Sequence, residues 1–206
     1  MSEPRAVAGS VQEVVPGLWH WHLRDERIGG FISAAHAVRT RDGLVLVDPL
    51  PLVEDAFASL GPVAAIVLTT SVHQRSTWRL RRQLDLRVWA PAASKRFDEE
   101  PDERYVEGDE LPGGLDAIFT PGAGTTQHSL LLAENDGVLV TPDLFARADG
   151  EDLALVPGEY MHDPAEARRT AERLLDLEFA VLCTGHGLPV TDDPKSAIRN
   201  ALAEAA

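Results

Sequence analysis

A run of polar residues between positions 69 and 76 combines hydroxyl, imidazole and guanidinium groups directly after an apolar segment. Residues 64–69 are typical of a strand buried on both faces, and a helix is expected to begin at Ser76. Backbone N–H groups at a helix start favour an anion, and an arginine can hold a carboxylate or phosphate through two hydrogen bonds. The sequence therefore predicts a site for a small anionic ligand, formed by Thr69, Thr70, Ser71, His73, Arg75 and Ser76.

Other histidines and the single cysteine also have chemistry to offer, each beside a simpler structural explanation. His20 and His22 alternate along an expected strand, so both can point to one side, as in a two-histidine metal site or in a half-buried strand with aromatic packing. Cys183 precedes His186 by three residues, and a thiolate–imidazole pair would be a nucleophile. A lone cysteine at the end of a buried strand is more often a small packed side chain.

The elements that must position these residues fall into two β-rich sets, each followed by helical segments. Short strands joined by tight turns are expected at residues 11–15, 18–23, 31–38 and 44–47, and again at 115–120, 129–133 and 138–141. Strands are also expected at 87–90 and 179–183, and helices at 52–60, 76–84, from Asp163-Pro164 onward, and at 193–205. Two sheets packed face to face with helices outside would bury these elements, which predicts an α/β (α+β) protein.

Length and charge restrict the classes of function. The 206 residues suit one domain spanning 1–206, with residues 1–10 loose because they are small and polar. The net charge of −14 disfavours nucleic-acid binding, which needs a basic surface. One cysteine excludes an intrachain disulfide, and neither a signal peptide nor an apolar membrane span is expected. We therefore expect a cytoplasmic protein without a membrane partner, and a homodimer stays possible.

Four segments, in order along nearly the whole chain, resemble the landmarks of the metallo-β-lactamase superfamily. They are Leu46-Val47-Asp48, Ile66-Val67-Leu68-Thr69, Thr120-Pro121-Gly122 followed by Thr141-Pro142-Asp143, and Thr184-Gly185-His186-Gly187. This resemblance implies a four-layer αββα sandwich. It also implies a pocket at the sheet edges, where these segments would meet.

The metal ligands that the resemblance implies are largely missing. The family's His-x-His-x-Asp-His motif corresponds here to Thr70, Val72, Gln74 and Arg75. The family's Thr-Pro-Gly motif continues with histidine, and here the next residue is Ala123. The remaining expected ligands are Asp143 and His186, so the standard two-metal centre is not expected.

The loop after the buried strand resembles that of a smaller set of lactamase-like proteins, most of them without an assigned function. Their pattern Leu-Thr-x-x-x-His-x-Arg-Ser matches Leu68, Thr69, His73, Arg75 and Ser76. This match supports the fold and implies no reaction.

Three functions follow. The first is a domain without the two-metal chemistry and without a cofactor, which binds a small anionic ligand or a partner. The alternative is a hydrolase of esters, thioesters or phosphoesters that uses one zinc, manganese or iron ion at His73, Asp143 and His186. The third is a metal-free enzyme with His73 as general base and Arg75 stabilising an oxyanion.

A purely structural explanation of the same residues is also open. Asp143 and His186 would then hydrogen-bond each other and join two loops. Arg75 would pair with the side chain of Asp48 or Asp143 and replace the charge of the lost metal, which keeps buried carboxylates satisfied.

Overall fold

The computed structural model describes residues 3–134 and 136–205. Within that range the first sheet has the strand order β1 (Gln12–Val15), β2 (Leu18–Asp25), β3 (Phe31–Thr40), β4 (Gly43–Val47), β5 (Val63–Val67), β6 (Arg87–Pro91) and β7 (Glu103–Tyr105). The second has the order β12 (Ala154–Leu155), β11 (Val138–Arg147), β10 (His128–Leu132), β9 (Leu115–Phe119) and β8 (Glu110–Leu111), and β13 (Val181–Gly187) pairs with β11 in parallel.

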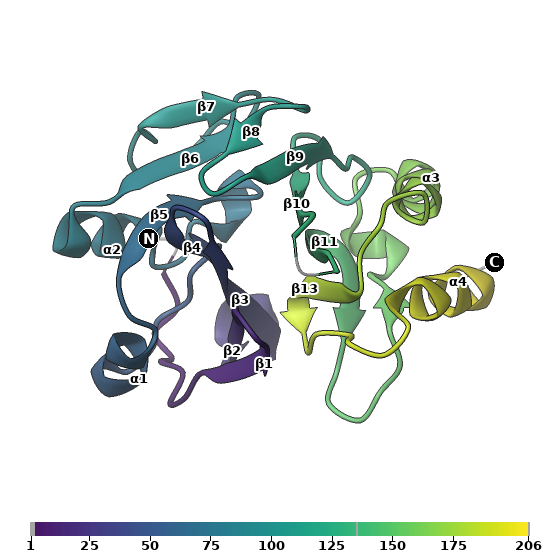
Figure 1. The fold of residues 1–206 in the computed structure, drawn as a ribbon. Coiled ribbons are helices and arrows are strands. Elements are labelled where there is room, and N and C mark those ends of the chain that lie inside the picture. The colour runs from purple at the N-terminus through teal and green to yellow at the C-terminus, as the bar shows by residue number, and fades with distance from the viewer. Residues whose placement is uncertain (1–2, 135, 206) are drawn as a thin grey trace.

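Helices cover the outer face of each sheet (Figure 1). α1 (Glu54–Ser59) and α2 (Thr77–Leu84) lie beside the first sheet, and α3 (Pro164–Leu174) and α4 (Pro194–Glu204) lie beside the second. The predicted αββα arrangement is therefore confirmed. No helix in the described part of the chain is long and apolar enough to cross a membrane.

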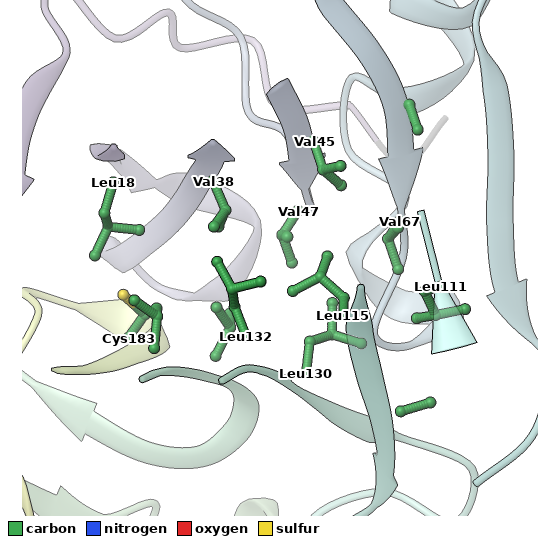
Figure 2. Close-up of a cluster of buried hydrophobic side chains, with 14 of the residues drawn as sticks. Leu18, Val38, Val45, Val47, Val67, Leu111, Leu115, Leu130, Leu132 and Cys183 are labelled. Atoms are coloured by element: carbon green, nitrogen blue, oxygen red, sulfur yellow. The ribbon is translucent and has the colours of Figure 1, made fainter. Parts of the chain in front are cut away.

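Three layers of apolar side chains separate these four layers of structure. The layer between the sheets contains Val45 and Val47 of β4, opposite Leu115, Leu130 and Cys183 (Figure 2). The alternate residues of β4, Leu44 and Leu46, belong to the layer that also contains Trp78 and Leu80 of α2. Successive side chains of a strand point to opposite faces, so a strand buried on both faces needs the continuous apolar run that the sequence shows here. The layer under α3 and α4 contains Leu139, Leu182, Ala171 and Ile198.

Two strands are longer than expected, and both carry candidate site residues. β11 was expected to end at Thr141, but it continues through Asp143 to Arg147. Its pairing with β13 shifts register between Thr141 and Ala146, which accommodates Pro142, a residue that cannot donate to a sheet ladder. β13 continues likewise through His186. Asp143 and His186 therefore project from paired strands.

The start of α3 follows the predicted chemistry. Asp163 precedes the helix with an extended backbone, its carboxylate accepts from the backbone N–H of Glu166 at 2.9 Å, and Pro164 occupies the first helical position. The N-terminal segment, expected to be loose, is partly packed. Met1 and Ser2 lie outside the described residues. Among residues 3–10, Ala8 is buried and donates its backbone N–H to Pro51 O at 2.9 Å.

Candidate metal centre

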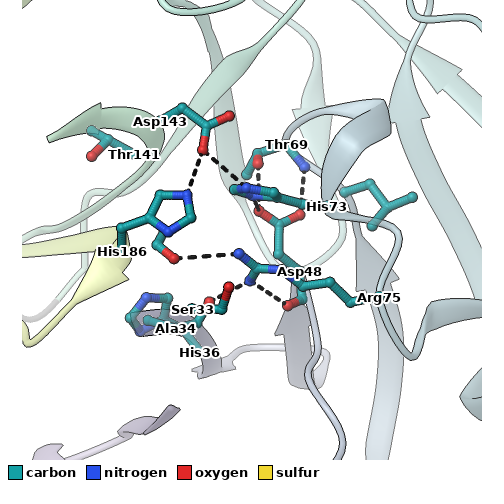
Figure 3. A network of polar contacts seen from close by, with 12 residues as sticks. Ser33, Ala34, His36, Asp48, Thr69, His73, Arg75, Thr141, Asp143 and His186 are labelled. Atoms are coloured by element: carbon teal, nitrogen blue, oxygen red, sulfur yellow. Dashed lines mark hydrogen bonds and ion pairs between the residues drawn. The ribbon is translucent and has the colours of Figure 1, made fainter. Parts of the chain in front are cut away.

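Three side chains that are distant in the sequence converge at one end of the two sheets (Figure 3). His73 ends a short 3₁₀ helix at Ser71–His73, and its Nε2 lies 3.0 Å from Oδ1 of Asp143. Nε2 of His186 lies 2.8 Å from the same oxygen. One potential ligand atom from each residue lies within 4.8 Å of the other two. The structure therefore brings together His73, Asp143 and His186, the residues of the single-metal alternative.

Each histidine is oriented by a second contact through its other ring nitrogen. Nδ1 of His186 lies 2.9 Å from the backbone carbonyl oxygen of Ile32, and Nδ1 of His73 lies 3.0 Å from Oδ2 of Asp48. A carbonyl or carboxylate oxygen only accepts, so Nδ1 carries the proton in both rings. In a neutral imidazole the lone pair is then on Nε2, and both lone pairs face Asp143.

This arrangement requires a cation. Two imidazole lone pairs and one carboxylate oxygen repel each other unless protons or a metal ion lie between them. Burial and the charge of Arg75 lower the pKa of His73, but Asp143 and Asp48 outweigh them and raise it above its ordinary value. Burial raises the pKa of Asp143, but His73 and His186 outweigh it and hold it well below its usual range.

The donor set fits a metal ion as well as protons. Two imidazole nitrogens and one carboxylate oxygen are a three-ligand set found for zinc and for non-haem iron(II). Nδ1–H donors to a carboxylate or a backbone carbonyl are the usual supports of histidine ligands. The side chains of Asp143 and His186 are 23% and 18% exposed, whereas His73 is nearly buried, so solvent reaches one side of the group.

Asp48 joins the loop after β4 to the loop after β5. Its Oδ1 accepts from the backbone N–H of Thr69 at 2.9 Å, and its Oδ2 accepts from the Thr69 hydroxyl as well as from His73. Its backbone φ is 47°, a left-handed conformation that aspartate tolerates better than most residues. The sequence marked Asp48 as a landmark, but a single sequence carries no signal for its bond to His73.

Arg75 does not replace a metal by pairing with a carboxylate, and that structural expectation is wrong. Arg75 is 2% exposed, and its guanidinium donates to three backbone carbonyls, those of Ala34, Asp48 and Gly185. Among the described residues it has no ion-pair partner within 4.0 Å. Its contact with Asp48 is to the backbone carbonyl oxygen and not to the carboxylate.

The predicted anion site receives no support from the geometry. The N–H and hydroxyl of Thr69 donate to Asp48, and Nη1 and Nη2 of Arg75 donate to backbone carbonyls. Thr70 and Ser76 are also buried, and Ser71 is half-buried. Direct contact between most of these groups and a ligand would require the loop to rearrange.

The other family ligand positions have structural contacts. The amide of Gln74 donates to the carbonyls of Ser71 and Arg96, and its oxygen accepts from the indole N–H of Trp78. The carbonyl of Ala123 accepts from the backbone N–H of His162 at 3.1 Å. These positions now stabilise the loops that surround the three-residue group.

The remaining sequence candidates lie apart from this group or are inert. Burial raises the pKa of the Cys183 thiol, which packs between the sheets, so it offers no thiolate. Nε2 of His20 lies 3.2 Å from Nδ1 of His22, and the His20 ring packs against His36. Burial, followed by the charges of His36 and His22, lowers the pKa of His20 to about 2.

Comparison with known proteins identifies both a family and a fold. The model of the family described as "Metallo-beta-lactamase superfamily" matches residues 13–205. No curated protein matches the chain significantly.

Several solved structures share the fold. The DIM-1 metallo-β-lactamase exposed to ceftazidime has a TM-score of 0.74 at 13% identity, with 98% of this chain and 99% of that chain covered. A metallo-β-lactamase from Pontibacter korlensis has a TM-score of 0.71 at 19% identity, with 94% and 98% covered. A HARLDQ motif mutant of the enzyme from Cronobacter sakazakii has a TM-score of 0.67 at 17% identity, with 95% and 93% covered.

Proposed function

Because the chain belongs to the metallo-β-lactamase superfamily, we propose that it is a hydrolase whose centre holds a single metal ion on His73, Asp143 and His186. One observation carries the proposal: Nε2 of both histidines lies within 3.0 Å of the same Asp143 oxygen. The same contacts favour this function over the ligand-binding domain, because they form a cation site where the loop donors offer no accessible anion site.

The chain's own residues have distinct roles in this proposal. His73 and His186 would bind the metal ion through Nε2, because their Nδ1–H groups donate hydrogen bonds to Asp48 and to the carbonyl of Ile32. Asp143 contributes the negative charge. A zinc or iron(II) ion held by these residues would supply an activated water, because it would lower the pKa of that water toward neutrality.

The reaction class follows from this set of groups. Asp143 and His186 are partly exposed, so solvent water reaches this edge of the three-residue group. Hydrolysis of an ester, thioester or phosphoester needs an activated water and a group that polarises the oxygen of the substrate. We therefore assign the protein to hydrolysis of one of these bonds.

The test is metal content by mass spectrometry on protein purified without a histidine tag, with zinc, manganese or iron added and excess removed. We expect one ion per chain in the parent, and none in Asp143→Ala or His186→Ala. His162→Ala is the matched control, because His162 is exposed and contributes its backbone N–H to Ala123. Two ions per chain, no ion in the parent, or an ion retained by His186→Ala would overturn the proposal.

Activity is tested on the same proteins with chromogenic esters, thioesters and phosphoesters. Hydrolysis that appears with the metal, is absent from His186→Ala and persists in His162→Ala supports the proposed reaction class. Hydrolysis at the parent rate in His186→Ala contradicts it.

A further inference from the structure

Arg75 is a buried cation held by the protein backbone. Its guanidinium donates to Ala34 O and Asp48 O through Nη1, the latter at 3.2 Å, and to Gly185 O through Nη2 at 3.3 Å. Ala34 belongs to β3, Asp48 follows β4, and Gly185 belongs to β13. One side chain therefore joins three strands, and β13 comes from the opposite sheet (Figure 3).

Each of these carbonyls belongs to, or lies within two residues of, a proposed metal ligand or a residue that orients one. Asp48 itself accepts from Nδ1 of His73. Gly185 precedes His186, and Ala34 lies two residues from Ile32, whose carbonyl accepts from Nδ1 of His186. The guanidinium thus fixes the backbone on which both histidine orientations depend.

β13 packs so closely against His73 that the position of its backbone affects the position of the imidazole. A Cβ atom on Gly185 would lie 2.9 Å from Cε1 of His73 and 2.5 Å from Pro142 O. Arg75 is two residues after His73 and has a φ of 42°, so the chain turns back sharply to deliver the guanidinium under Gly185. Small changes at this position would alter the separation of His73 from His186.

Burying the positive charge of Arg75 costs free energy, because the guanidinium loses its contact with water. Burial lowers the pKa of Arg75, although the charges of Asp48 and Asp143 raise it. Moving a charged group out of water carries a large desolvation cost, which hydrogen bonds and nearby charges must offset. The planar guanidinium reaches these acceptors from two separate nitrogen atoms, whereas an ammonium group carries its three donors on a single nitrogen.

We infer that Arg75 is a positioning residue for the metal centre, which sets the relative placement of His73 and His186 through the carbonyls of Ala34, Asp48 and Gly185. This inference rests on the proposed function. It predicts the direction in which metal affinity changes when Arg75 is replaced. Removing a neighbouring positive charge would by itself tighten the binding of a metal cation, whereas loosening the ligands would weaken it.

The experiment compares two variants. Arg75→Lys keeps the positive charge but loses the planar set of guanidinium donors, whereas Arg75→Asn loses both and tolerates a positive φ. We expect the zinc affinity of each variant to fall at least tenfold, as for other supports of metal ligands. The visible absorption spectrum of the cobalt(II)-loaded protein should also change, because it reports the ligand geometry. Millimolar guanidinium should restore the parent spectrum and affinity in Arg75→Asn and leave Arg75→Lys unchanged.

Arg24→Lys is the matched control, because Arg24 is exposed and also donates to a backbone carbonyl, that of Gly30. Unchanged or tighter zinc binding in Arg75→Lys overturns the inference. If Arg75→Asn loses its near-ultraviolet circular dichroism and does not fold, Arg75→Lys decides alone. A parent that binds no metal overturns the proposed function instead, so the two failures are distinguishable.

Discussion

The imidazole of His73 bridges two carboxylates, with Nδ1 3.0 Å from Oδ2 of Asp48 and Nε2 3.0 Å from Oδ1 of Asp143. The carboxylate of Asp48 also accepts twice from Thr69, so its orientation is fixed independently of the histidine. A change at Asp48 should therefore alter the metal centre without removing a ligand.

We expect Asp48→Asn to reduce zinc affinity by about tenfold to hundredfold, the range typical of such supports. Asparagine tolerates the φ of 47° at this position, so the backbone can be retained while the negative charge is lost. Competition with a chromophoric chelator measures the affinity. Asp116→Asn, on an exposed position of β9, should bind zinc like the parent, and an unchanged affinity in Asp48→Asn would contradict the assigned role.

Gly185→Ala should damage both stability and metal binding. The added methyl group would lie 2.5 Å from Pro142 O and 2.9 Å from Cε1 of His73, so β11, β13 or the His73 loop must shift. Overpacking of this kind costs about 1–3 kcal/mol, measured as a lower free energy of unfolding in denaturant. Gly9→Ala is the control, since nothing lies within 4 Å of its added Cβ. Equal stability and zinc affinity in Gly185→Ala and the parent would show that β13 can move freely.

The buried histidines that are not candidate metal ligands should make the fold sensitive to acid. Burial lowers the pKa of His36 to about 4, although Thr184 and Asp48 raise it, and the pKa of His20 is lowered to about 2. Both rings bind a proton near pH 6.5 when unfolded, so stability is fully present above that pH. As pH falls from 6.5 to about 4, each ring contributes a loss of about 1.4 kcal/mol per pH unit.

His36→Gln tests this pH dependence, because an amide can still donate to Thr184 O as His36 Nε2 does at 3.1 Å. Denaturant unfolding between pH 4 and 7, with chelator present to exclude effects of metal, should give a shallower pH dependence in His36→Gln than in the parent. His73, whose pKa is raised, contributes in the opposite direction, but equally in both proteins. Identical slopes would show that folding does not change the pKa of His36 and would contradict this prediction.

Metal removal should lower the melting temperature. A ligand bound only to the folded state adds about 2.7 kcal/mol of stability at a free concentration of 100 times its dissociation constant. Thermal unfolding of the parent should therefore shift upward with added zinc and downward with chelator. His186→Ala should respond to neither addition, and an equal response in that variant would place the zinc elsewhere.

The fold was predictable because its signals are local. β4 and β5 are continuous apolar runs that supply both faces of a buried strand, and Asp163-Pro164 marks the start of α3 from side-chain chemistry alone. The end of β11 was not predictable, because Pro142 stops a strand in most contexts. Here a shift in register, which depends on the neighbouring strand, lets the strand continue.

The three residues of the proposed metal centre were predictable from the sequence, but the hydrogen bonds around them were not. The sequence predicts His73, Asp143 and His186 together as the ligands of the single-metal alternative, and their convergence supports that alternative. The contacts of Arg75 were predicted wrongly, because an arginine near two aspartates suggests an ion pair. Its acceptors are backbone carbonyls, and a carbonyl belongs to every residue, so no residue type in the sequence identifies them.

The three residues of the proposed metal centre are divided between the two sheets. His73 follows β5 of the first sheet, whereas Asp143 and His186 belong to β11 and β13 of the second. A folding intermediate with one sheet formed offers at most two ligands, so tight metal uptake must wait until both sheets have docked. Contacts of such large sequence separation form slowly. The rate at which a chelator-resistant ion appears during refolding would therefore time the last long-range step of folding.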